Sequence, residues 1–151
     1  DVVGLGPYFD GYGVLPNPDD DLNLVLDSYT TEAQNAAVIV REHKALTQAA
    51  GLGLVAYEAG PGGIGDGSGT DLAIQAHRHD RMREIVRSYL EGIDAELDLT
   101  VYFASSGQPS KYGSWGMIEA MDQPREQAVK YLAVQDFLDA GSTCNREPGC
   151  E

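Results

Sequence analysis

Residues 53–63 read GLVAYEAGPGG, and the rest of the chain is best interpreted outward from them. Apolar and aromatic side chains lead to one carboxylate, Glu58, after which the backbone enters a glycine-rich break. A run of this kind is typical of a buried parallel strand that ends at the rim of a sheet. Because ligands bind at this rim in α/β folds, Glu58 is a candidate nucleophile or base.

The segments around this strand repeat a strand-then-helix order three times. Residues rich in β-branched and aromatic side chains, such as residues 99–103, alternate with stretches whose apolar residues recur at helical spacing. The clearest stripe consists of Met82, Ile85, Val86, Tyr89, Leu90 and Ile93. The first helix has a stripe of Ala36, Ile39, Val40, His43, Leu46 and Ala50, in which His43 is expected to be partly buried. The residues of the last helix that are expected to face inward are Ala128, Tyr131, Leu132 and Leu138. Thr31 and Gln34 fit a capping box, Asp80 fits an N-cap, and Pro124 fits a first helical turn. The expected strands cover about residues 2–9, 52–58 and 97–104, and the expected helices about residues 31–50, 81–93 and 124–141.

The connections between these elements differ in length according to their direction. Helix-to-strand connections are short, whereas strand-to-helix connections are long, over residues 10–30, 59–79 and 105–123. The additional chain therefore lies at the carboxyl ends of the strands, the face that carries function in β/α barrels. The pattern predicts an α/β fold with a parallel sheet. Three strands cannot close a barrel that needs eight, so if this is barrel sequence, residues 1–141 form only a portion of the barrel.

Composition restricts the classes of partner. The chain has 151 residues and a formal net charge of −14. A nucleic acid or an anionic membrane would be repelled at long range, so neither partner is expected. No segment approaches the roughly 20 apolar residues that a membrane-spanning helix requires. A neutral ligand such as a sugar meets no electrostatic barrier.

Two cysteines lie in a short tail, residues 142–151. Cys144 and Cys150 enclose five residues that include the turn formers Pro148 and Gly149, which favours a Cys144–Cys150 disulfide and an oxidising compartment. The alternative is a pair of free thiols in a flexible tail.

Two motifs carry a resemblance to a known family. LVAYEAG at residues 54–60, followed by KYGSWG at residues 111–116, resembles the C-terminal part of retaining glycoside hydrolases of the clan A (β/α)8-barrel type. It is most similar to a group of secreted hydrolase-like proteins with Tyr-Glu-Gly-Gly and Lys-Tyr-Gly-Ser-Trp-Gly segments. The resemblance extends from about Gly6 to Leu138 and implies that the three strands correspond to the sixth, seventh and eighth of the barrel.

The resemblance also implies roles and a missing partner. Glu58 matches the nucleophile at the end of the seventh strand, and neither a cofactor nor a metal is implied. The general acid/base belongs to the fourth strand, which has no counterpart here, so another chain or a preceding segment would complete the barrel. Ala59 departs from the family pattern, which has glycine there. Retaining hydrolysis needs both carboxyl groups, about 5–5.5 Å apart.

A nucleophilic Glu58 must stay ionised and therefore needs hydrogen-bond donors nearby. Tyr8, at the end of the first expected strand, is a candidate donor and substrate-binding residue. Tyr57 is expected to point to the opposite side of the strand and to pack. The alternative for Glu58 is a structural carboxylate that caps a loop or pairs with Arg78 or Arg81.

Four further side chains are candidates for sugar binding. Trp115 and Tyr112 could stack on a sugar ring, or Trp115 could anchor its loop. His77 and His79, in the expected loop before the second helix, could donate hydrogen bonds to hydroxyl groups. A His-x-His pair without a third ligand is weak evidence for a metal, and a role in loop structure or helix entry competes with both readings.

Three interpretations remain open at this point. The first is a retaining glycoside hydrolase with Glu58 as nucleophile. The second is a non-catalytic carbohydrate-binding or extracellular structural protein that keeps the barrel. The third is a self-contained flavodoxin-like domain, disfavoured because no phosphate-binding glycine turn opens the first helix.

Overall fold

The computed structural model describes residues 1–9, 19–63 and 69–141. The chain forms a mixed α/β fold around a three-stranded parallel sheet in the order β1-β2-β3. The strands are β1 (Val2–Leu5), β2 (Gly53–Ala59) and β3 (Leu99–Tyr102). The predicted strand order and parallel pairing are therefore confirmed.

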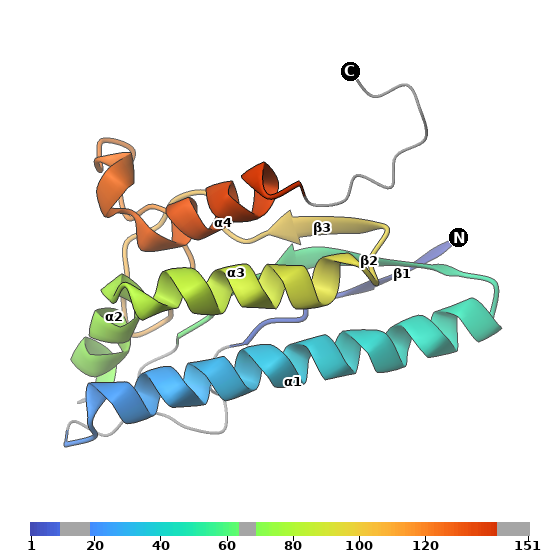
Figure 1. The fold of residues 1–151 in the computed structure, drawn as a ribbon, viewed down its shortest axis with the longest axis horizontal. Coiled ribbons are helices and arrows are strands. Elements are labelled where there is room, and N and C mark those ends of the chain that lie inside the picture. Colours follow the sequence, from blue (N-terminus) through green and yellow to red (C-terminus); the bar gives the residue numbers. More distant parts are fainter. Residues whose placement is uncertain (10–18, 64–68, 142–151) are drawn as a thin grey trace.

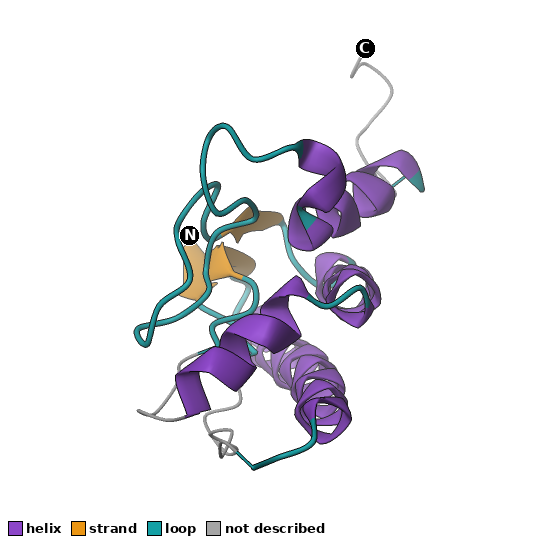
Figure 2. Cartoon of the chain, turned by 90° about the vertical axis from the view of Figure 1, so that its left-hand side faces the viewer, coloured by secondary structure: helices purple, strands orange, loops and turns teal. Residues whose placement is uncertain are grey.

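Helices cover one face of this sheet, as Figures 1 and 2 show. In the centre of this layer, α3 lies between α1 and α4 (Figure 1). A 3-10 turn, η2, precedes α4. The bounds are α1 (Leu22–Ala49), α2 (Thr70–Arg78), α3 (Arg81–Asp94), η2 (Arg125–Gln127) and α4 (Val129–Asp139).

The core lies between the sheet and the helix layer. From β2, Leu54, Ala56 and Ala59 are fully buried. The apolar stripe expected on α3 is confirmed, because every member of it is buried. Its members are Met82, Ile85, Val86, Tyr89, Leu90 and Ile93.

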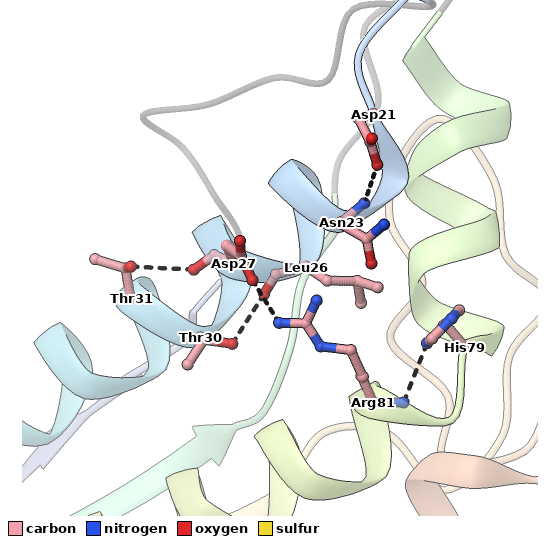
Figure 3. Close-up of polar contacts among 8 residues, drawn as sticks. All are labelled: Asp21, Asn23, Leu26, Asp27, Thr30, Thr31, His79 and Arg81. Atoms are coloured by element: carbon pink, nitrogen blue, oxygen red, sulfur yellow. Dashed lines mark hydrogen bonds and ion pairs between the residues drawn. The ribbon is translucent and has the colours of Figure 1, made fainter.

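The first helix begins earlier than the capping box predicted. Asp21 is the N-cap, and its carboxylate accepts a hydrogen bond from the backbone N–H of Asn23 at 2.7 Å (Figure 3). Thr31 instead lies inside α1, where its hydroxyl donates to the Asp27 carbonyl at 3.0 Å. A hydroxyl that is satisfied by the preceding turn can remain within a helix, which explains why Thr31 does not mark a start.

The buried face of α1 also differs from the expected stripe. Ile39 and Leu46 are 49% and 69% exposed, and His43 is exposed rather than partly buried. Three alanines, Ala33, Ala36 and Ala37, are among its buried residues. They allow α1 to approach α3 closely: a methyl group built on Gly92 would lie 3.1 Å from Cβ of Ala37.

Two segments near the site depart from the predicted elements. Residues 70–78, expected as loop, form α2. At the other end, α4 starts at Val129, after the 3-10 turn, rather than at Pro124. The inward face of α4 also differs from the expected one: Lys130 and Ala133 are buried, whereas Leu138, expected to face inward, is exposed.

The sheet face opposite the helices is apolar and exposed in the described part of the chain. Tyr57 belongs to it and is 57% exposed, so the prediction that it packs is wrong for this chain. Its exposed apolar members, called the open face below, are Val2, Tyr57, Leu99, Val101 and Phe103.

Two expectations from the sequence concern the C-terminal tail and membrane-spanning helices. The tail at residues 142–151, with Cys144 and Cys150, lies outside the described residues. Within the described ranges, no helix combines the length and apolarity needed to cross a membrane.

Candidate functional site at the carboxyl ends of the strands

The loops that follow the three strands meet at one end of the sheet (Figure 2). Phe9 and Pro61 form a parallel bridge, and the Gly62 N–H donates to the Phe9 carbonyl at 3.2 Å. The third loop joins through the Ser114 N–H, which donates to the Gly62 carbonyl at 2.7 Å. These backbone hydrogen bonds hold the ends of all three connections together.

A bulge in β2 sets the position of Glu58. Regular pairing after Ala56 and Thr100 would place Glu58 opposite Tyr102, on the side of the sheet that faces the helices. Ala59 takes that position instead and is completely buried. The additional residue removes Glu58 from the buried row, which is how bulges redirect side chains near functional sites.

The carboxylate of Glu58 meets the ring of Tyr8. The Tyr8 hydroxyl donates a hydrogen bond to Glu58 Oε2 at 2.8 Å, and both side chains are half-buried. The predicted donor is therefore in place. This hydrogen bond between a phenol and a carboxylate holds the Glu58 side chain in one orientation, as a nucleophile requires.

Two further aromatic rings lie beside the Tyr8 ring. The Tyr8 ring lies edge-on to Trp115, with centroids 5.1 Å apart, and to Phe103, at 6.3 Å. Phe103 and Trp115 are 5.9 Å apart. These three residues, called the aromatic cluster below, place apolar ring surface next to the Glu58 carboxylate.

The backbone fixes Trp115 firmly. Its indole N–H donates to the Tyr112 carbonyl at 2.9 Å, and its own carbonyl accepts from the Ala104 N–H at 3.1 Å. The peptide bond between Phe103 and Ala104 is cis. The indole N–H is bonded within the protein, so the part of Trp115 that could contact a ligand is its ring surface.

Tyr112 serves this site through its backbone. Its side chain is 72% exposed, and the Lys111 ammonium lies 4.9 Å from the centre of its ring. Its side chain makes no contact with the aromatic cluster among the interactions of the described residues.

His77 was expected in a loop. It lies instead near the end of α2, deep inside the protein. Its Nε2 is 3.2 Å from the Tyr29 hydroxyl, and a side chain on Gly63 would collide with the imidazole. Burial, and then the positive charge of Lys130, hold the pKa of His77 well below its ordinary value. The imidazole is therefore neutral and packs between α1 and α2.

His79 connects α2 to α3. Its Nδ1 accepts a hydrogen bond from the Arg81 N–H at 3.2 Å, as Figure 3 shows. Asp80, the expected N-cap, makes no capping hydrogen bond with its side chain. The His79 ring therefore acts at the start of α3, which is the helix-entry role that the sequence offered as an alternative to sugar binding.

The arginines offered as alternative partners of Glu58 bind other carboxylates. Arg78 forms two hydrogen bonds with Glu119, at 2.6 and 2.7 Å, and Arg81 pairs with Asp27 at 2.5 Å (Figure 3). The alternative that Glu58 pairs with either arginine is therefore wrong. Among the described residues, no group of three or more His, Cys, Asp or Glu side chains could hold a metal ion.

Sequence reasoning missed two residues of this region. Phe103 was treated only as a β-former, although its place at the end of a strand puts its ring beside Tyr8. Lys130 is buried and donates a hydrogen bond to the Ser114 carbonyl. Its spacing of three residues from Ala133, which puts both on one face of a helix, was the available signal in the sequence.

A groove of about 420 Å³ lies elsewhere, between α1 and α3. Gln34, Arg41 and Tyr89 are among the residues that line it. None of the predicted site residues contributes to this groove, so it is separate from the carboxyl-end site.

Comparison of the chain with protein-family models, with curated proteins and with solved structures gave no match.

Proposed function

We propose that this chain provides the nucleophile side of a retaining glycoside hydrolase. The observation that carries the proposal is the 2.8 Å hydrogen bond from Tyr8 to Glu58 beside the aromatic cluster. A rigidly held carboxylate next to exposed ring surface suits a reaction at a sugar carbon.

In this mechanism Glu58 attacks the anomeric carbon and forms a glycosyl ester as the leaving oxygen departs. Tyr8 holds the carboxylate in orientation until attack. The apolar face of the sugar ring lies against Trp115. Water then hydrolyses the ester and regenerates Glu58.

The second carboxyl group, which protonates the leaving oxygen, is supplied by additional β/α units from another chain or segment. Two features of the sheet support this part of the proposal. Its open face is apolar, whereas parallel sheets are normally covered on both faces. β1 and β3 also each have one edge without a strand partner in the described fold. We propose that the sheet forms three strands of a β/α barrel in a secreted protein.

A specific observation favours the second candidate, a non-catalytic carbohydrate-binding protein. Among the described contacts, Glu58 has no carboxyl neighbour that could act as the acid, and its partner is Tyr8. Ala59, where the resemblance predicts glycine, is part of the bulge. Both candidates use the aromatic cluster, and they differ in whether Glu58 forms a covalent bond.

Trapping the glycosyl ester distinguishes the candidates. Fluoride is a good leaving group that needs little help from an acid, so 2-deoxy-2-fluoroglycosyl fluorides test the nucleophile without the missing carboxyl group. We expect a panel with gluco, galacto and manno configurations to include one sugar that labels Glu58, detected by mass spectrometry of the proteolysed chain. Glu58→Gln should prevent labelling, whereas Glu84→Gln, a change at an exposed helical carboxylate, should not.

The binding candidate predicts a different result. It predicts saturable sugar binding, seen as a change in Trp115 fluorescence, with no covalent label in the wild-type protein. If label appears on other carboxylates to the same extent as on Glu58, the proposed nucleophile is wrong.

A further inference from the structure

Lys130 is an unusual buried cation. It lies on α4 and is 6% exposed, in a chain with 10 basic and 24 acidic residues. Lysine is almost never fully buried unless its ammonium is paired, because removing the charge from water is costly. The described hydrogen bond of this ammonium is to a backbone carbonyl, that of Ser114.

Ser114 connects this lysine to the candidate site. It is completely buried, and its N–H donates to the Gly62 carbonyl at 2.7 Å. The next residue is Trp115, whose ring contacts Tyr8 at 5.1 Å between centroids. The peptide unit between Ser114 and Trp115 is therefore held from one side by Lys130 and leads on the other side to the aromatic cluster.

We infer that Lys130 is a positioning residue: its buried side chain fixes the Ser114 carbonyl and thereby holds the Trp115 indole beside Tyr8 and Glu58. The inference rests on the proposed function for one point, that the sugar ring lies against Trp115. Lys130 itself does not touch the reacting atoms.

The charged and titratable groups around Lys130 come from each neighbouring element. His77 of α2 faces it, and Glu119 of the loop after β3 attracts it while bound to Arg78. The ion pair that links α3 to α4, Arg83 with Asp136, lies at the surface.

Of these groups, Lys130 is the one that exchanges its proton near neutral pH. Burial lowers its pKa to about 7, against the opposing attraction of Glu119. The pKa of His77 is held far below neutrality, and hydrogen bonds from Arg78 lower the pKa of Glu119. A charged ammonium donates a stronger hydrogen bond than a neutral amine, so the bond to Ser114 weakens as the pH rises through this range.

The sequence provides two specific probes for a test. Trp115 is the only tryptophan, and Lys44, Lys111 and Lys130 are the only lysines. In the wild-type chain, NMR of isotopically labelled lysine side chains would follow Lys130 while the indole N–H signal reports on Trp115. We expect both signals to shift with the same midpoint near neutral pH.

Two variants complete the test. Lys130→Met keeps most of the apolar length of the side chain but removes its charge and its hydrogen-bond donor. We expect it to displace the indole signal and abolish its pH response. His77→Gln should keep that response, because the imidazole is neutral throughout.

The inference is overturned if the indole signal does not follow the Lys130 midpoint, or if Lys130→Met retains the wild-type response. Should this variant fail to fold, the wild-type titration decides alone. Absence of a glycosyl label on Glu58 would refute the proposed enzyme without affecting this coupling, so the two failures are distinguishable.

Discussion

At Glu58, one additional residue in β2 determines the chemistry that the carboxylate can perform. Without the bulge, the side chain would enter the layer of helices, where an ionised carboxylate would be costly. With it, Ala59 fills the buried position, and Glu58 meets the Tyr8 hydroxyl. The small side chain of Ala59 fits the buried position opposite Tyr102 that Glu58 would otherwise take.

The Tyr8 hydroxyl is the donor whose removal should affect the reaction most directly. A hydrogen bond to a charged group contributes about 1.5–3 kcal/mol, so Tyr8→Phe should slow glycosyl labelling of Glu58 by roughly tenfold to a hundredfold. The rate is measured by mass spectrometry over time.

Tyr57→Phe is the matched control. Tyr57 is next to Glu58 in sequence, but its ring lies on the open face. Equal slowing in both variants would show that the Tyr8 hydroxyl has no special role at the carboxylate.

At the scale of the elements, the close approach of α1 to α3 organises the helix layer. Ala37 and Gly92 meet where the two helices pack, which turns larger residues of α1 such as Ile39 towards solvent. Small residues at a contact allow two helices to approach, so this pair sets the spacing over the sheet.

Gly92→Leu should therefore separate the two helices. We expect a loss of about 1–3 kcal/mol in the free energy of unfolding, which is typical of overpacking in a core. Urea denaturation followed by circular dichroism measures it.

Glu91→Leu, at an exposed position of the same helix that does not line the groove between α1 and α3, is the control and should leave the stability within about 0.5 kcal/mol of wild type. A similar loss in both variants would mean that the side chain disturbs α3 itself rather than its contact with α1.

At the scale of the whole molecule, the distribution of apolar side chains is one-sided. The helices bury one face of the sheet, and the open face exposes valine, leucine and aromatic side chains. Exposed apolar patches of this kind mark interaction surfaces, and here the patch adjoins Phe103 of the aromatic cluster.

Charging the open face should change association but not folding. Replacing Leu99 and Val101 by lysine should abolish binding of the dye ANS to this face, while the unfolding midpoint changes little. Dye fluorescence and thermal unfolding are measured together.

Lysines at Ile39 and Leu46, apolar residues exposed on α1, are the matched control and should leave most dye binding intact. A large loss of stability in the strand variant would show that Leu99 and Val101 are covered in solution, contrary to the open face.

The sequence alone determined the elements whose signals are local. The alternation of strands and helices predicted the parallel sheet. The apolar stripe predicted the buried face of α3, because a strongly amphipathic helix has only one face that it can bury. The strand end at Glu58 also follows from the glycine-rich break behind it.

Only the tertiary structure decided the features that depend on contacts between distant residues. The bulge at Glu58 depends on pairing with β3, and the inward face of α1 depends on Gly92, which belongs to α3. The neutral state of His77 and the burial of Lys130 likewise require that α2, α4 and the loop of Ser114 come together. Periodicity describes one segment at a time, whereas the packing partner of a side chain is fixed only when the segments meet.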